Sequence, residues 1–410
     1  MSTGLRSIAS SEARRDDMRP TGHIRERSPE SWELRYSLGT DPATGKRRTA
    51  TATVKGDRRA AEKELRRLLR TLDTGEHVDP TRITLREWLT TWLAAVREEV
   101  SPKTHERYSE IVQNFLVLEL GALPITKLSA AHIQAAYTKW ATEGRRDGKK
   151  GGLSPRTRRH IHRIFNCALA RAVEQQVLAR NPGDAFRKRL PKVERREMVT
   201  LSPEQSARLL EAIRHTRFYW PVLLALSTGM RRGETLALRW KNVDLERGTL
   251  RVVESLEQTK SGIRFKAPKT DRVRVITLPG FATEALRRHK REQAEELLML
   301  GIRQSGENLV CGRADGLPLQ PQTLTHNFIR LVGRLRDLPR VRFHDLRHSH
   351  ATQLLLDGVH PKIAQERLGH ASITTTLDLY SHVTDTMQND AAARLDVAFR
   401  TAITHVAGTK

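Results

Sequence analysis

The sequence predicts a multidomain α+β protein: a small N-terminal three-stranded β-sheet plus a helix, then a helical domain, then a mainly α domain with a small antiparallel sheet. Three observations lead to this expectation. The chain has 410 residues, which at about 100–200 residues per domain allows two to four domains. Apolar residues follow the period of strands near the N-terminus and the period of helices over most of the remainder. A proline-containing basic stretch at 181–197 separates two periodic regions, as an interdomain linker does.

The N-terminal β-rich unit is expected at 20–78, after a polar tail at 1–19. Apolar and polar residues alternate from Trp32 to Leu38, which is the period of a half-buried strand. A second strand is expected at about Arg48–Val54, and an amphipathic helix follows from about Arg58 to Leu72. A sheet with one helix fits a small module of this length.

Residues 82–180 have the pattern of a helical domain. A capping box begins at Thr84 and precedes an apolar run. Two Ser-Pro pairs, at 101–102 and 154–155, each place a cap residue before a proline at the first helical position. Apolar residues repeat with helical period from Ile161 to Val173, and we expect this stripe to face the core.

The third domain is expected at 198–383. It should contain a short β region at about Thr249–Leu256, Ile263–Phe265 and Val273–Leu278. After Pro279 the pattern is helical to the end of the chain, including the tail at 384–410. The tail has an apolar stripe of helical period at Met387, Ala391, Leu395, Phe399 and Ile403.

The charge balance indicates a polyanionic partner. Lysine and arginine number 72 and aspartate and glutamate 47, so the net charge is +25, and the pI is about 10.8. This surplus favours DNA or RNA over an anionic membrane. The sequence contains no run of about 18 apolar residues, so it predicts no membrane span. The two cysteines cannot form a disulfide framework or a structural zinc site. We expect a cytoplasmic protein that associates with the nucleoid when bound to DNA.

Basic residues are concentrated at four places in the first half of the chain: the N-terminal strands, the glycine-rich loop at 144–152, the helix after it and the linker. Glycines let the backbone approach a phosphate closely, and neighbouring cations suit phosphate contacts. A solvated charged surface is the alternative interpretation. The predicted DNA-contacting residues are Arg47, Arg48, Lys149, Lys150, Arg156, Arg159, Lys188 and Arg196.

A first chemical motif is Thr-Gly-Met-Arg-Arg-Gly-Glu at 228–234, just before a short helical run. Following a glycine turn, Arg231 can present its planar guanidinium to two phosphate oxygens. Glu234 lies one helical turn further and can orient Arg231. A surface Arg–Glu pair is the simpler alternative.

A second motif is His-Asp-Leu-Arg at 344–347, which places His344 and Arg347 on one helical face. A histidine with a pKa near 6.5 can exchange a proton at neutral pH, while the arginine holds a phosphate oxygen. Metal binding is a rival interpretation because His348 and His350 follow closely. However, His350 does not share the face of the other two histidines, and no nearby acidic cluster completes a site. We therefore expect no metal.

A third motif, Leu-Gly-His at 368–370, ends a short helix that begins near Pro361, and Tyr380 follows ten residues later. A lone tyrosine is usually a packing residue. Together with Arg231, Lys269, His344, Arg347 and His370, however, it completes a set of cationic or protonatable groups around one phenol. A phosphodiester needs such a set if a tyrosine attacks it.

The whole set resembles the tyrosine recombinase (phage integrase) family. The likeness is carried, in the family's order and spacing, by the motifs at 228–234, 268–270 (Pro-Lys-Thr), 344–348, 368–370 and by Tyr380. It covers about 200–383. The region 82–180 resembles the family's core-site-binding domain, and the N-terminal unit looks like the arm-site-binding module of many phage and mobile-element integrases.

This resemblance implies the roles of the site residues. Arg231 and Arg347 would clamp the scissile phosphate. His344 and His370 would hydrogen-bond to it, and His344 is the candidate base. Tyr380 would attack the phosphorus, leaving a 3′-phosphotyrosine and a free 5′ hydroxyl without metal, ATP or any other cofactor.

The identity of the acid that protonates the 5′ oxygen stays open at this point. The resemblance implies Lys269, but Lys260 and Lys266 lie in the same β hairpin. Either of these lysines is an alternative.

The resemblance also implies the partners. The substrate would be double-stranded DNA with attachment-type sites, and the protein would be a monomer alone and a homotetramer on DNA. An excisionase or directionality factor and a host DNA-bending protein are further expected partners, with no membrane involved. The C-terminal helix would pack on its own domain or, as the family implies, on a neighbouring subunit.

Three other functions compete with an integrase of a phage or integrative element. A chromosome-dimer-resolving recombinase typically lacks an arm-binding module, which the N-terminal unit resembles. A non-catalytic DNA-binding protein with the same fold would not need the intact six-residue set. A relaxing topoisomerase fits less well with two DNA-binding modules ahead of the catalytic domain.

Overall fold

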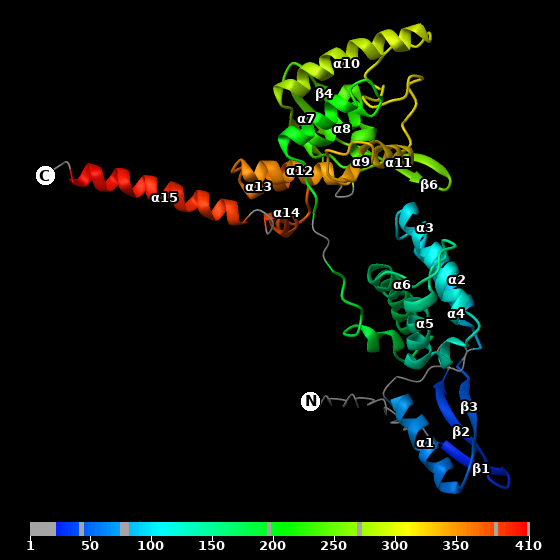
Figure 1. Ribbon diagram of the computed structural model, residues 1–410. Helices are drawn as coiled ribbons and strands as arrows, with labels where there is room; N and C mark the ends of the chain where they lie inside the picture. Colours follow the sequence, from blue (N-terminus) through cyan, green and yellow to red (C-terminus); the bar gives the residue numbers. More distant parts are fainter. Residues whose placement is uncertain are drawn as a thin grey trace, which may run out of the picture. The chain divides into compact units, whose positions relative to one another are not determined.

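The computed structural model describes residues 22–40, 45–73, 82–194, 198–268, 273–380 and 384–407. The predicted tail at 1–19 and the site residues Arg196 and Lys269 lie outside these residues. The chain divides into two compact units, Met1–Val193 and Glu194–Lys410, and each is described by itself (Figure 1).

The first unit begins with an antiparallel sheet in the order β1-β2-β3, one helix and a small apolar core, as predicted. Leu34 and Tyr36 of the central strand are buried with Ala61 and Leu65 of the helix. The alternation seen in the sequence therefore places one face of the sheet against the helix. The elements are β1 (Gly22–Ser28), β2 (Ser31–Thr40), β3 (Arg47–Lys55) and α1 (Arg58–Asp73).

The rest of the first unit is helical. The predicted capping box at Thr84 is present, and Ser101 and Ser154 cap the two helices that begin with proline. The predicted stripe on α6 is buried, and Trp88 donates its indole N–H to the Ala168 carbonyl on that helix at 3.0 Å. The elements are α2 (Leu85–Val96), α3 (Pro102–Ile111), η1 (Val112–Val117), α4 (Leu118–Leu120), η2 (Ile125–Lys127), α5 (Ala130–Glu143), α6 (Pro155–Glu174) and η3 (Pro182–Phe186).

The second unit is mainly helical with two small sheets, which agrees with the predicted fold class. Its helices are α7 (Pro203–Ala212), α8 (Tyr219–Thr228), α9 (Arg232–Ala237), η4 (Trp240–Asn242), α10 (Gly280–Met299), α11 (Pro321–Val332), α12 (Phe343–Leu356), α13 (Pro361–Leu368), α14 (Ile373–Tyr380) and α15 (Thr384–Ala407). Its strands are β4 (Val243–Asp244), β5 (Thr249–Val252), β6 (Ser255–Thr259), β7 (Gly262–Lys266) and β8 (Arg274–Thr277).

The β region predicted as one stretch at Thr249–Leu256 is divided between two sheets. β5 pairs with β4 and β8, whereas β6 forms a separate hairpin with β7. On the three-stranded sheet Leu250 and Ile276 are buried in the core, while Arg251 and Val275 face outward. This alternation gives the sheet an inner and an outer face.

The expectation of continuous helix after Pro279 is wrong between α10 and α11. Residues 300–320 form an irregular segment that hydrogen-bonds through its backbone to the stretch around Trp240. The Val310 N–H donates to the Leu238 carbonyl at 2.8 Å, and the Asn308 carbonyl accepts from the Trp240 N–H at 3.1 Å. Leu309, Val310, Cys311 and Leu319 of this segment are buried, because these bonds hold that part of it against the core, whereas Leu300, Ile302 and Leu317 are exposed. Period alone does not separate such a segment from a helix.

The predicted apolar stripe falls on the C-terminal helix α15, and the side chains of two of its members, Met387 and Ala391, lie outside what the structure describes. Leu395, Phe399 and Ile403 are exposed. Among the described residues, no helix is both long enough and apolar enough to cross a membrane.

Candidate active site

The site is built where two helices end at left-handed glycines. α8 ends before Gly229 (φ 68°) and α13 ends before Gly369 (φ 66°). A Cβ at Gly229 would lie 2.6 Å from Leu368 Cδ2 and 2.7 Å from His350 Cδ2. Glycine is required here both for its positive φ and for the close approach of the two helix ends.

Arg347 ties these two helix ends together. It lies on α12, which packs against α8, α13 and α14 (Figure 1), and its side chain is buried, with the residue only 3% exposed. Its guanidinium donates to the Gly229 carbonyl and the Leu368 carbonyl, each at 2.7 Å. Burial lowers its pKa to about 9, and the charge of Arg231 adds to this. Arg347 therefore remains a cation at neutral pH and is attractive to an anion.

Arg231 lies beside this cation. Its Nη2 donates to the Gly369 carbonyl at 2.9 Å, and its Nη1 donates to Glu234 Oε1 at 2.9 Å. The two arginines thus bind consecutive carbonyls, those of Leu368 and Gly369. This arrangement holds two guanidinium groups in one place, which suits recognition of a phosphate.

Glu234 is not part of a surface pair, because its side chain is only 1% exposed. It accepts hydrogen bonds from the Arg231 backbone N–H at 2.9 Å and from Arg274 Nη2 at 2.5 Å. Burial raises the pKa of Glu234, but the hydrogen bonds and charges of Arg274 and Arg231 outweigh it, so the net pKa is lowered. Glu234 is therefore an ionised carboxylate between two arginines.

Arg274 on β8 is a residue that the sequence reasoning missed. Besides Glu234, it donates through Nε to the Arg367 carbonyl at 3.1 Å, and its side chain is 9% exposed. A signal was available: strand alternation places Arg274 on the same face as buried Ile276, an unusual position for a cation.

Two histidines lie next to the arginines. His344 is one helical turn before Arg347, and its ring stacks edge-on against His348 at 4.9 Å between centroids. His370 accepts or donates a hydrogen bond of 2.9 Å between Nδ1 and Thr376 Oγ1. Desolvation, followed by neighbouring positive charge, lowers the pKa of each of these two histidines to about 4. Both are therefore neutral at pH 7.

His350 has a structural role instead. Its Nδ1 lies 2.8 Å from the Leu226 carbonyl, and its Nε2 accepts a hydrogen bond from Arg367 Nε at 3.1 Å. Within the described ranges, no three His, Cys, Asp or Glu side chains are grouped so that they could hold a metal.

The remaining predicted site residues are placed less completely. Tyr380 is the last residue of α14, which packs against α12 and α13. Lys269 lies outside the described residues. Of the alternative lysines, Lys266 forms an ion pair with Glu257 on the neighbouring strand, and Lys260 lies at the turn of the β6–β7 hairpin. The described DNA-contact candidates are all exposed: Arg47, Arg48, Lys149, Lys150, Arg156, Arg159 and Lys188.

Comparison with known families matches two parts of the chain. Residues 199–387 match the model of the phage integrase family. Residues 84–141 match the N-terminal SAM-like domain of phage integrases.

Curated relatives are similar over most of their length. A "Tyrosine recombinase XerC-like" protein of Caldanaerobacter subterraneus is 28% identical over 362 residues, covering 83% of this chain and 90% of the relative. The ICEBs1 integrase of Bacillus subtilis is 28% identical over 369 residues, covering 89% of this chain and 96% of the relative. The integrase of Mycobacterium phage L5 is 26% identical over 307 residues, covering 73% and 76%.

Solved structures share the fold. The Tn1549 transposon integrase in complex with a circular intermediate DNA has a TM-score of 0.63 at 24% identity, covering 76% of this chain and 99% of that one. A lambda integrase dimer bound to a COC′ core site has a TM-score of 0.53 at 20% identity, covering 87% and 93%.

Proposed function

Because the chain belongs to the phage integrase family of tyrosine recombinases, we propose that it is the integrase of a phage or integrative element. In this proposal it cuts and rejoins two DNA sites through a covalent bond to Tyr380. The observation that carries it is the pair Arg231 and Arg347, bound to consecutive carbonyls beside two neutral histidines. Two fixed cations with neutral hydrogen-bonding groups match the charge that develops on a phosphodiester under attack.

In the first step the Tyr380 oxygen forms a bond to phosphorus and the bond from phosphorus to the 5′ oxygen breaks. The phenol has a pKa near 10 and must lose its proton, and His344 is the candidate acceptor. Lys269 is the candidate donor of a proton to the leaving 5′ oxygen. A second 5′ hydroxyl reverses the step on a new partner, so no ATP is consumed.

The arginines and histidines stabilise the five-coordinate transition state. Arg231 and Arg347 bind its non-bridging oxygens, and His344 and His370 hydrogen-bond to them. Each such donor contributes about 2.7–4 kcal/mol in comparable oxyanion sites. Glu234 holds Arg231 in place rather than touching DNA.

The remaining parts of the chain would select the DNA. We assign arm-site binding to 20–78, core-site binding to 82–180, a basic linker to 181–197 and catalysis to 198–383. The exposed cations of the first unit and the net charge of +25 support this assignment.

We also propose that the protein is a monomer alone and a homotetramer on its sites. The exposed apolar stripe of α15 (Leu395, Phe399 and Ile403) supports packing of the tail at 384–410 on a neighbouring subunit.

The test is covalent capture on a nicked duplex that carries the element's own end sequence, in the presence of EDTA. The wild-type protein should form a protein–DNA adduct that survives denaturation. Tyr380→Phe should bind the same duplex and form no adduct. An adduct with the phenylalanine variant would place the nucleophile elsewhere, and complete dependence on magnesium would indicate a metal nuclease instead.

A further inference from the structure

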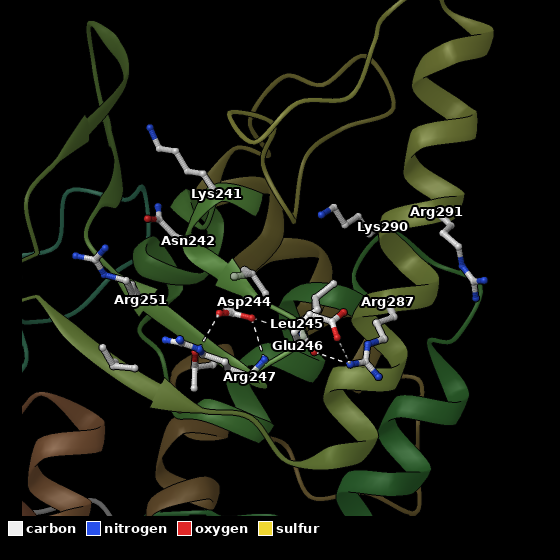
Figure 2. Close-up of a pocket in the computed structure, with 13 residues that line it drawn as sticks. Lys241, Asn242, Asp244, Leu245, Glu246, Arg247, Arg251, Arg287, Lys290 and Arg291 are labelled. Carbon is white, nitrogen blue, oxygen red and sulfur yellow. Dashed lines mark hydrogen bonds and ion pairs between the residues drawn. The ribbon is translucent and has the colours of Figure 1, made fainter.

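The second unit contains a basic hollow of about 870 Å³ that the proposed reaction does not use. It lies between helix α10 and the outer face of the β4-β5-β8 sheet (Figure 2). Six exposed cations line it: Lys241, Arg247, Arg251, Arg287, Lys290 and Arg291.

The hollow and the candidate active site lie on opposite faces of one sheet. On β8 the side chain of Arg274 contacts Glu234 on the inner side. Val275, the next residue, is 61% exposed and lines the hollow, and Arg251 pairs with it on the adjacent strand. Because successive strand residues point to opposite faces, an occupant of the hollow cannot be the phosphate held by Arg231 and Arg347.

Much of the hollow's charge is not neutralised. Its two acidic residues are Asp244 and Glu246, and Lys241 forms an ion pair with Glu307 outside the lining at 2.7 Å, so three of the six positive charges remain. Asp244 and Glu246 each lie 3.9 Å from an arginine, a weak pairing at an exposed position. Within the described part of the chain, the Arg251 and Arg291 side chains have no hydrogen-bond or ion-pair partner.

The chemistry of the lining favours a phosphate backbone over a peptide. No aromatic residue lines the hollow, and its apolar lining residues are Val243, Leu245 and Val275. Protein interfaces usually contain an aromatic or larger apolar anchor. Four arginines and two lysines around an open hollow are instead typical of contacts to DNA phosphates.

We propose that this hollow binds the sugar-phosphate backbone of a second DNA duplex, separate from the one at the active site. The proposal rests on the proposed function, since a recombinase must handle more than one DNA segment. It adds a DNA contact on the catalytic domain facing away from the scissile phosphate.

Site-specific cross-linking tests the proposal in the full chain. Cys167 is exposed and is first replaced by serine. Val275→Cys then places a thiol in the hollow, and Leu298→Cys, also exposed but outside the lining, is the matched control. The protein is first loaded with the nicked duplex and then given a second duplex with an activated disulfide tethered to one phosphate, so that thiol–disulfide exchange forms the cross-link and releases the activating thiol. The second duplex should cross-link to Val275→Cys and not to Leu298→Cys.

Removing charge should remove this contact. Arg251→Gln and Arg291→Gln are added to the Val275→Cys protein, and the yield is measured at subsaturating DNA and about 0.1 M salt. The cross-linking yield should fall at least about tenfold, since each lost phosphate contact changes the slope of log affinity against log salt concentration by about 0.9. Arg303→Gln with Arg336→Gln, two exposed arginines outside the lining, should leave the yield unchanged. Equal yields in the two double variants would overturn the proposal. The proposal would also be overturned if a polyglutamate peptide inhibited cross-linking at Val275→Cys and unlabelled duplex did not.

The covalent adduct on the first duplex separates this proposal from the proposed function. Both double variants should form that adduct at the wild-type rate. Adduct formation without cross-linking at Val275→Cys refutes only the second DNA contact. Absence of the adduct in the wild-type protein refutes the proposed function itself.

Discussion

Substitution of Arg274 by methionine tests whether the buried ion pair with Glu234 positions Arg231. The change removes two hydrogen bonds to Glu234, at 3.2 and 2.5 Å, and one to the Arg367 carbonyl at 3.1 Å. Among the described residues, Glu234 then remains buried with Arg231 as its one cationic partner. Leaving a buried charge partly unpaired costs about 3–5 kcal/mol.

A loss of this size is measurable by thermal unfolding. At about 2–4 °C per kcal/mol for a unit of this length, the melting temperature of the C-terminal unit should fall by about 6–20 °C. Arg231 should also bind Glu234 more tightly and the phosphate less well. A displaced positioning group can cost up to about 100-fold in rate, so single-turnover cleavage below the melting temperature should slow by about 10–100-fold.

Two further variants make the result interpretable. Glu234→Gln combined with Arg274→Met removes both charges and should recover part of the lost stability, because the two residues are coupled. It should not recover cleavage, since Arg231 has then lost its carboxylate partner. Arg303→Met, at an exposed position, is the control. If Arg274→Met were as stable and as active as this control, Arg274 would not position the site.

Three further predictions concern the rest of the site. His344 and His370 have pKa values near 4, so about nine-tenths of each is unprotonated at pH 5. If they act as neutral groups, kcat/KM for cleavage should be nearly as high at pH 5 as at pH 7. If their pKa values were instead near 6.5, kcat/KM at pH 5 would fall to a few per cent of its value at pH 7. Since these two pKa values are lowered from 6.5, their contribution to stability is fully present above pH 6.5 and is lost as the pH falls towards 4, so near-UV circular dichroism should accompany each assay. Gly229→Ala should lose more stability in urea than Gly358→Ala, which has a similar φ of 73° but nothing within 4 Å of the added Cβ; equal losses would show that the close approach to Leu368 is unimportant. Lys269→Ala should cleave a normal duplex slowly but recover on a duplex with sulfur at the 5′ bridging position, because a thiol leaves without needing an acid; failure to recover would assign the acid to another group.

Local patterns in the sequence predicted most of the secondary structure. The capping box at Thr84 and the Ser-Pro pairs before α3 and α6 begin helices where expected, because caps depend on residues within one helical turn. The prediction was wrong in the segment 300–320, whose backbone hydrogen bonds reach Leu238 and Trp240. Partners so distant along the chain leave no local signal.

The candidate site shows the same division. The motifs at 228–234, 344–348 and 368–370 are local, and the sequence predicted Arg231, His344, Arg347 and His370 before any geometry. Arg274 was missed because its role depends on Glu234, 40 residues away, and on the Arg367 carbonyl. The catalytic roles of all six residues, Lys269 and Tyr380 included, stay predictions.

The sequence by itself determined the fold class and the family and proposed the candidate site residues, since these depend on residue type and on short spacings. Only the tertiary structure showed that Arg347 and Arg231 bind carbonyls at the ends of two helices, and that Glu234 is a buried carboxylate between two arginines. It alone showed the basic hollow on the other side of the same sheet. The physical reason is that burial, pKa and charge balance depend on groups brought together from distant parts of the chain.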